Sequence, residues 1–505
     1  MTRSRIHHII FFLGLIVLVA ALPESHFVMG LGFFMILLNW LAEWNWKEKW
    51  HLLKENKEGL VFSGIFVFFV LGLFLADDWS RAASFLLDKI PMLLLPVIIV
   101  TSQPVTKREL KWVFDSFIAS TTFFCFLSLC YWATHEVSDV REITIGIDHI
   151  RFSLCVVFSI VLCANSIIQK QYKQDWMAWL YVLTILFLTG YLFVVQTLTG
   201  IVVLAALIVF YILYLFVKMP HSRMRTALMS LSIACLLGGA LYVTVISLQY
   251  FKDKDKTIDS RQTALGNPYE FDASSMIENG HRIGYYVCPD ELRSAWTMRS
   301  DTAYTEIIEQ TLIRYLNSKG LHKDYAAVMS LSEQDVRNVE KRMANYAYAN
   351  VIGLRRALYQ TFFSLSLYQK FHTIDDSSLM QRVELWSASC KVIGDHWLLG
   401  VGMGDHKVAL DEQLAKQNSP IADRHNRGSH SQYLTFWLMG GILLLLYFFF
   451  VIIYPFVRMR PRITLVYTAL ILIILLSCLA EDTLETQTGR LIYATLLPLL
   501  LFSEQ

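Results

Sequence analysis

The sequence predicts an all-α polytopic membrane protein, with about 12 transmembrane helices and a large, mainly helical insertion between the ninth and the tenth. Of its 505 residues, 55% are apolar and only 17% are charged, whereas a soluble domain carries about 25% charged residues. The charges are also uneven, because residues 251–429 hold 45 of the 86 Lys, Arg, Asp and Glu side chains. This composition excludes an ordinary soluble enzyme and a disordered protein. The net charge of +2 gives no reason to expect nucleic-acid binding.

Twelve apolar runs are long enough, or nearly so, to cross the bilayer as helices, which takes about 20 residues. The fourth and the last are short, and Pro91 and Pro96 predict that the fourth is bent or partly re-entrant. The first run could instead be a signal peptide, but the apolar run that soon follows favours an uncleaved span. The runs cover residues 7–22, 27–43, 59–75, 91–103, 112–132, 152–168, 176–194, 199–217, 226–249, 431–456, 463–480 and 489–503.

The Lys and Arg residues in the short loops predict the orientation of these helices. With the N-terminus inside, the inside loops carry 17 of these residues and the short outside loops carry 5. Both termini are then cytoplasmic, and the 251–429 insertion lies outside. Tryptophans at positions 40, 44, 46 and 50, mixed with lysines, are typical of an anchor at the cytoplasmic interface.

The insertion has the pattern of water-exposed helices, which divides the chain into predicted domains 1–250, 251–429 and 430–505. Apolar residues recur at spacings of three and four within three segments, and Ser332 has the pattern of a helix start. A further helix is predicted near the end of the insertion. The predicted helical segments are 302–317, 331–350, 352–371 and 377–393.

The stretch 382–441 combines glycines with chemically active side chains. Arg382 stands four residues before Trp386, a Gly-x-Gly-x-Gly turn occupies residues 400–404, and His430 stands just before the tenth span. The turn does not follow a strand and open a helix, so it does not indicate a dinucleotide site. In these motifs and in its topology, the chain resembles the bacterial superfamily of O-antigen ligases and O-antigen polymerases, which also includes O-linked protein oligosaccharyltransferases.

The resemblance implies an inverting, metal-independent transfer of a glycan from an undecaprenyl-diphosphate carrier to an acceptor, on the periplasmic face of the bacterial inner membrane. It implies that His430 activates or positions the acceptor, which fits an imidazole that titrates near neutral pH. It also implies that Arg382 binds the diphosphate, which a guanidinium can grip with two parallel hydrogen bonds. The alternatives are a histidine that caps the span, and an arginine paired with Glu384, Asp375 or Asp376 on a solvated face.

One arginine typical of this superfamily is missing. Members carry it in a short outside loop between two middle spans, and the matching segment here, residues 196–200, has Leu198 in its place. Arg151, at the outer end of the sixth span, is the expected substitute, with an interfacial anchor as the alternative.

Three polar residues are weaker candidates for contacts with the sugar or the diphosphate. Asp405 follows the glycine turn, Gln432 stands two residues after His430, and Glu481 lies in the last outside loop. Glu481 could also form a salt bridge with Arg382, or the loop could be an ordinary polar connection.

No metal or other cofactor is expected. Asp253 and Asp255 match the Asp-x-Asp pattern of metal-dependent glycosyltransferases, but lysines flank them, and no His or Cys spacing fits a metal site.

The alternative of another class is a transporter or flippase. No repeat of two six-span halves is visible, and few charges lie within spans, which argues against it. Among transferases, the acceptor remains open between lipid A–core, which the motif spacing favours, a growing glycan and a protein.

Overall fold

The computed structural model describes residues 3–135, 143–218, 223–255, 258–350, 354–374 and 377–504. The chain forms two compact units, residues 1–211 with 382–505, and residues 212–381, and each has its own hydrophobic core. These boundaries differ from the predicted ones at 250/251 and 429/430. The helix over 223–251 packs against elements of the insertion, whereas the end of the insertion packs with the apolar helices.

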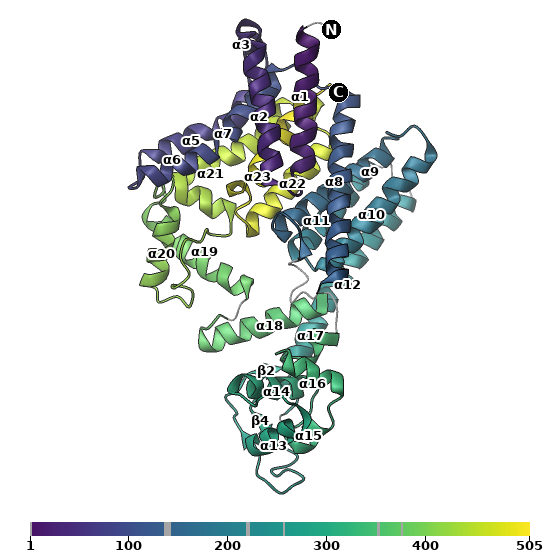
Figure 1. Cartoon of the computed structure of the whole chain (residues 1–505), viewed down its shortest axis with the longest axis vertical. Coiled ribbons are helices and arrows are strands. Elements are labelled where there is room, and N and C mark those ends of the chain that lie inside the picture. The colour runs from purple at the N-terminus through teal and green to yellow at the C-terminus, as the bar shows by residue number, and fades with distance from the viewer. Residues whose placement is uncertain are drawn as a thin grey trace. The chain divides into compact units, whose positions relative to one another are not determined.

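The first unit consists of apolar helices, which Figure 1 shows from α1 in purple to α23 in yellow. Polar caps begin several of them: Thr106 and Glu109 form a reciprocal capping box at α8, and Asp148 caps α9. The helices that lie wholly or mainly in this unit are α1 (Arg3–Ala21), α2 (His26–Glu43), α3 (Trp46–Glu55), α4 (Glu58–Ser63), α5 (Ile65–Leu73), α6 (Trp79–Asp88), α7 (Ile90–Thr101), α8 (Lys107–Thr134), α9 (His149–Ile168), α10 (Asp175–Val195), α11 (Leu198–Lys218), α19 (Ser378–Asp395), α20 (His406–Lys416), α21 (Gln432–Arg458), α22 (Leu465–Ala480), α23 (Gln487–Leu491) and α24 (Leu497–Phe502).

Each predicted span contains a helix, but the helices differ in their ability to cross a membrane. In the part of the chain that the structure describes, eight helices are long and apolar enough, or nine if one bent pair is a single span. Among the described residues, the predicted eleventh and twelfth spans correspond to the shorter apolar helices Leu465–Ala480 and Gln487–Phe502. The predicted ninth span corresponds to the apolar stretch Leu237–Phe251 of a longer helix, Arg223–Phe251. The count of twelve is therefore not confirmed.

The fourth span is not broken as expected, and a sharp bend lies just before the third span instead. Helix segments Trp46–Glu55 and Glu58–Leu73 meet at 89°, whereas Trp79–Thr101 qualifies as one segment of 23 residues. Pro91 lies in the first turn of α7, where a proline removes no helical hydrogen bond, and α7 continues through Pro96.

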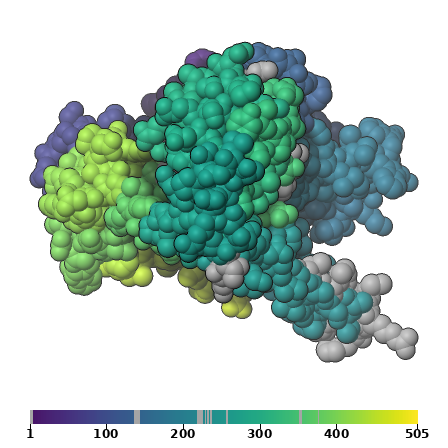
Figure 2. Space-filling model, turned by 90° about the horizontal axis from the view of Figure 1, so that it is seen from below, coloured from purple at the N-terminus to yellow at the C-terminus, as the bar shows by residue number. Residues whose placement is uncertain are grey.

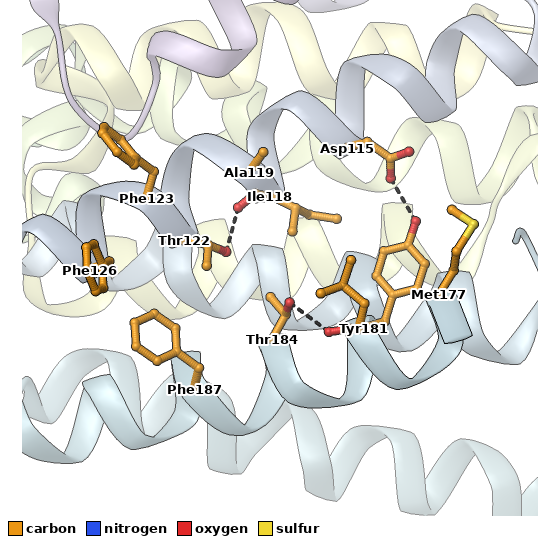
Figure 3. Close-up of a pocket in the computed structure, with 11 residues that line it drawn as sticks. Asp115, Ile118, Ala119, Thr122, Phe123, Phe126, Met177, Tyr181, Thr184 and Phe187 are labelled. Atoms are coloured by element: carbon orange, nitrogen blue, oxygen red, sulfur yellow. Dashed lines mark hydrogen bonds between the residues drawn. The ribbon is translucent and has the colours of Figure 1, made fainter. Parts of the chain in front are cut away.

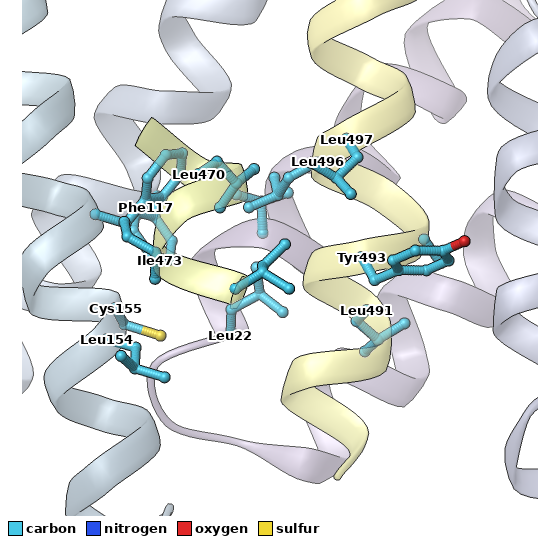
Figure 4. Packing of buried hydrophobic residues seen from close by; sticks show 14 of the residues in the cluster. Leu22, Phe117, Leu154, Cys155, Leu470, Ile473, Leu491, Tyr493, Leu496 and Leu497 are labelled. Atoms are coloured by element: carbon cyan, nitrogen blue, oxygen red, sulfur yellow. The ribbon is translucent and has the colours of Figure 1, made fainter. Parts of the chain in front are cut away.

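Helix α9 is the most buried of the long apolar helices and packs against α8, α10 and α22. Figure 4 shows Leu154 of α9 near Phe117 of α8 and Ile473 of α22. In a membrane, such close packing holds helices together, since transfer from water contributes little there. This packing brings the start of α9, which carries Arg151, near the end of α22, which precedes Glu481.

The second unit combines short helices with two small antiparallel sheets that were not predicted. Strand β1 (Glu270–Phe271) pairs with β4 (Tyr285–Val287), and β2 (Ile277–Glu278) pairs with β3 (His281–Arg282). Figure 2 shows the middle of this unit in teal and green as one continuous surface. Its helices are α12 (Arg223–Phe251), α13 (Pro289–Arg299), α14 (Glu306–Ser318), α15 (Tyr325–Met329), α16 (Glu333–Glu340), α17 (Tyr346–Asn350) and α18 (Leu354–Phe371).

Helix α16 begins as predicted. The Ser332 hydroxyl accepts a hydrogen bond from the Asp335 amide at 3.2 Å, and the Asp335 carboxylate accepts one from the Ser332 amide at 3.0 Å. This reciprocal capping satisfies two backbone donors that the first turn leaves free.

Candidate active site

A buried carboxylate stands where three basic side chains from distant parts of the sequence converge. Glu481 follows the last residue of α22 and is 4% exposed. Arg382 of α19 donates from Nη2 to Oε1 of this carboxylate at 2.5 Å, and from Nε to the Ala480 carbonyl at 3.1 Å. His430 Nδ1 lies 3.7 Å from Oε2, and Arg151 Nη2 lies 4.0 Å from the same atom. We call Glu481, Arg382, His430 and Arg151 the Glu481 cluster.

The surroundings of Glu481 favour its charged form. Burial alone would raise the pKa of Glu481, but the nearby His430 imidazole and the charge of Arg382 outweigh burial and hold the pKa below its usual value. Glu481 is therefore ionised at neutral pH. Two guanidinium groups face this one carboxylate, and a guanidinium is a group that can bind an anionic ligand with parallel hydrogen bonds.

The backbone fixes His430, while its imidazole stays accessible. His430 has φ +51°, and its amide donates to Asp482 Oδ2 at 3.1 Å. Asp482 also accepts hydrogen bonds from Thr435 at 2.7 Å and Ser429 at 3.3 Å, and burial raises the pKa of Asp482 above its usual value despite these bonds. The N-cap of α21 is Ser431, so His430 does not cap the span. Its side chain is 37% exposed.

Arg151 is held by charge rather than by direct hydrogen bonds. Its Nη1 lies 3.7 Å from Asp148 Oδ1, and its Nε is buried and makes no hydrogen bond. The loop that lacks the expected arginine adjoins this helix end, because a Cβ on Gly200 would lie 2.8 Å from the Cβ of Ser153. Leu198 itself is 54% exposed. Arg151 is thus the cationic side chain that lies near the place of the missing one.

The partners proposed for Arg382 from local sequence are otherwise engaged or undescribed. Glu384 accepts hydrogen bonds from Ser419 at 2.6 Å and Gln417 at 3.3 Å. Asp375 and Asp376 lie outside the described residues. The salt bridge with Glu481, one of the two alternatives for that loop residue, is present.

The glycine segment at 400–404 is a tight turn within the first unit, as expected. Gly400, Gly402 and Gly404 all have positive φ, between 74° and 97°, which L side chains rarely adopt. The amide of Val401 donates to the Leu438 carbonyl at 2.7 Å, next to the point where Gly440 and Gly441 break α21. The turn therefore satisfies backbone groups that this break frees, and it fixes the start of α21, which His430 precedes.

The two other weaker candidates lie outside the Glu481 cluster. Asp405 accepts a hydrogen bond from the Asp77 amide at 2.6 Å and lies 3.6 Å from Arg81. Gln432 is fully buried, and both ends of its side-chain amide bond to residues 484 and 485. Gln432 therefore supports the loop that carries Glu481, with no face left for a sugar.

Sequence reasoning missed the contacts of three residues next to the cluster. The sequence indicates Asp482 and Glu485 only as members of an acidic loop that could bind sugar hydroxyls. It does not predict the contacts of Asp482 beside His430 or the ion pair of Lys89 with Glu485, at 2.7 Å. The signal was available for Lys89, because a charge beside an apolar run is a reason to suspect a functional partner. Its partner lies 396 positions away, which no local pattern indicates.

Metal ligands are not grouped in the part of the chain that the structure describes. Asp253 accepts a hydrogen bond from Arg282 Nη2 at 2.7 Å, and Asp255 lies 2.8 Å from His281 Nδ1. The Asp-x-Asp pair thus tethers the end of α12 to strand β3, within the second unit.

One cavity of the first unit lies apart from the Glu481 cluster. It is an open apolar groove of about 640 Å³, and Figure 3 shows its lining side chains on α8 and α10. At one end, Tyr181 donates to Asp115 at 3.0 Å, and Lys111 donates to both. The carboxylate within the span is therefore neutralised by its own neighbours, as expected of a charge that must remain in a membrane.

Comparison with known proteins identifies a family that resembles the segment carrying Arg382 and His430. Residues 346–449 match the family described as O-Antigen ligase. The match is about a fifth of the chain and contains Arg382, the glycine turn and His430, but neither Arg151 nor Glu481. No curated protein matches the chain.

Proposed function

Because residues 346–449 match the O-antigen ligase family, we propose that this protein is a membrane glycosyltransferase of the O-antigen ligase type. It transfers a glycan from an undecaprenyl-diphosphate carrier to an acceptor hydroxyl on lipid A–core, at the periplasmic face of the bacterial inner membrane. The observation that carries the proposal is the convergence of Arg382, Arg151 and His430 on Glu481.

The two arginines suit the leaving group. When the bond between the anomeric carbon and the diphosphate breaks, the diphosphate keeps the electron pair and gains negative charge. Arg382 and Arg151 stabilise that charge, and more strongly in the transition state than in the bound donor. Glu481 holds both guanidinium groups in place until the donor arrives.

The histidine suits the acceptor. With Nδ1 toward Glu481, Nε2 is the nitrogen left to accept the proton of the attacking hydroxyl. Glu481 then stabilises the imidazolium that forms, as a carboxylate does behind a catalytic imidazole. Attack opposite the departing diphosphate inverts the configuration at the anomeric carbon, and no step calls for a metal.

The direct test is transfer by purified protein supplied with lipid-linked donor and acceptor. His430→Ala is expected to insert and bind donor but to lose about 10²–10⁴-fold in rate, the usual contribution of proton transfer. The matched control is His425→Ala, since His425 lies five residues earlier and is 75% exposed. A His430→Ala variant that keeps more than about a tenth of the activity refutes the proposed base.

Glycan transfer by the purified protein should continue in excess EDTA, because no proposed step uses a metal.

A deletion strain separates this proposal from its alternatives. Loss of all long chains attached to core indicates a ligase, whereas chains of a single repeat indicate a polymerase. Unmodified protein acceptors with intact surface glycolipids indicate an O-linked protein oligosaccharyltransferase. A transporter or flippase would change where the glycan is found without changing which covalent bonds it makes.

A further inference from the structure

We infer that Lys89 and Glu485 form a positioning pair for the Glu481 cluster: they fix the loop on which Glu481 stands. This inference rests on the proposed transfer reaction and adds two residues to it, which act through Glu481. Lys89 stands at the junction of α6 and α7, and Glu485 stands four residues after Glu481.

The lysine of the pair is fully buried, and 16% of the Glu485 side chain is exposed. Lys89 is 0% exposed, and its ammonium lies 2.7 Å from Glu485 Oε2 and donates to the Leu484 carbonyl at 3.1 Å. The same ammonium lies 5.4 Å from the centre of the Phe69 ring, within the range of a cation–π contact. A single lysine thus joins the α6–α7 junction and α5 to the backbone and the side chain of the loop.

Gln432 connects this pair to both sides of the Glu481 cluster. Its Nε2 donates to Glu485 Oε1 at 3.1 Å, and its Oε1 accepts from the Leu484 amide at 2.7 Å. Its backbone amide donates to the Glu481 carbonyl at 3.2 Å. Since Gln432 is also the first residue of α21, directly after the turn that carries His430, the network fixes the carboxylate and the imidazole relative to each other.

A buried ion pair is a poor source of stability, because desolvation of two charges offsets most of their attraction. What it does supply is one preferred geometry, since either charge left alone in this apolar surrounding is strongly disfavoured. The Glu481 cluster needs that geometry: His430 lies 3.7 Å and Arg151 4.0 Å from Glu481. Both separations are too long for hydrogen bonds and depend on where the loop lies.

The experiment measures transfer for Lys89→Met and for the milder Glu485→Gln, each with and without Glu481→Gln. A displacement of about 1 Å can cost about 100-fold in rate, so Lys89→Met should lose about that factor and Glu485→Gln a smaller one. If the pair acts through Glu481, each change should cost less than about twofold once Glu481→Gln is present, because interacting residues are not additive.

The matched control is Lys49→Met. Lys49 is a lysine of similar burial, 4% exposed, whose ammonium lies 3.0 Å from Glu43 and bonds to the Trp40 carbonyl, on elements that do not carry the cluster. Its loss should lower the melting temperature comparably and leave the rate per folded molecule unchanged.

The outcomes separate this inference from the proposed function. Equal losses with and without Glu481→Gln overturn the positioning role, and so does a Glu485→Gln variant with the wild-type rate. If Lys89→Met does not fold, the Glu485→Gln cycle decides by itself. A different result would show that the proposed function is wrong, namely a His430→Ala variant that stays active.

Discussion

Arg382 contacts the end of α22 at two points, and only a guanidinium reaches both. Its Nη2 bonds to the Glu481 carboxylate and its Nε to the Ala480 carbonyl. Lysine keeps the charge but has one compact ammonium, so it cannot hold this fork or grip a diphosphate bidentately. A lost hydrogen bond to a charged group costs about 1.5–3 kcal/mol, so Arg382→Lys should slow transfer roughly 10- to 150-fold.

The measurement is the rate of transfer at saturating donor, with Arg382→Glu as the disruptive reference. If Arg382→Lys behaves as wild type while Arg382→Glu is inactive, Arg382 supplies local charge alone.

Variants of Arg151 test whether this arginine, at the start of α9, takes the role of the arginine that is missing at Leu198, at the start of α11. Arg151→Ala and Arg382→Ala should each weaken the apparent affinity for donor, and the double change should cost no more than their sum, because both act on one ligand. Leu198→Arg should restore part of the loss in an Arg151→Ala background, since Leu198 is exposed and its loop packs against α9.

If Arg151 only anchors its helix, Arg151→Lys and Arg151→Gln leave donor affinity unchanged, and Leu198→Arg has no effect. Apparent donor affinity for these variants, measured at low ionic strength, therefore distinguishes the two roles.

Local motifs predicted individual residues of the site better than they predicted the contacts between those residues. Arg382 and His430 stand in a recognisable stretch, so both could be singled out from sequence alone. Arg151 and Glu481 are 330 positions apart, and their meeting depends on the packing of α9 against α22. The weaker candidates were chosen by their place beside motifs, and their contacts separate them. Glu481 pairs with the basic side chains, whereas Gln432 bonds to the loop that carries Glu481.

At the scale of elements, helices with strong local signals were predicted and irregular segments were not. The apolar runs became helices, and Ser332 caps α16 through a hydroxyl four positions ahead of the first buried valine. The four strands of the second unit are two or three residues long, too short for an alternating pattern to show. The bend of 89° before the third span could not be predicted, because no proline or glycine pair stands there.

The break in α21 does have such a signal, and it yields a prediction. Gly441 has φ 65° and ψ −166°, a conformation that costs other residues of order 1–3 kcal/mol. A Cβ there would also collide with the Leu398 carbonyl. Gly441→Ala should therefore lower the melting temperature and misplace the start of α21, which reduces transfer per folded molecule.

The control is Gly190→Ala in α10, because a Cβ at Gly190 meets no atom within 4 Å. That change should be neutral or slightly stabilising, since alanine is the better helix former. Equal melting temperatures for the two variants would show that the break tolerates a side chain.

At the scale of the whole chain, orientation is the property on which the proposed chemistry depends, and the 17 to 5 bias of Lys and Arg predicts it. Two exposed positions test it: Leu265 in the insertion, 64% exposed, and Glu55 at the end of α3, whose side chain is 58% exposed. In spheroplasts, a membrane-impermeant maleimide should label Leu265→Cys above the parent protein, whose own Cys130 and Cys390 are exposed. It should label Glu55→Cys above the parent protein only after the membrane is permeabilised. No predicted span separates the insertion from the turn that carries His430, so labelling at position 265 also reports the side on which His430 lies. The reverse pattern would put the histidine in the cytoplasm, away from a periplasmic acceptor, and would exclude the proposed transfer to lipid A–core.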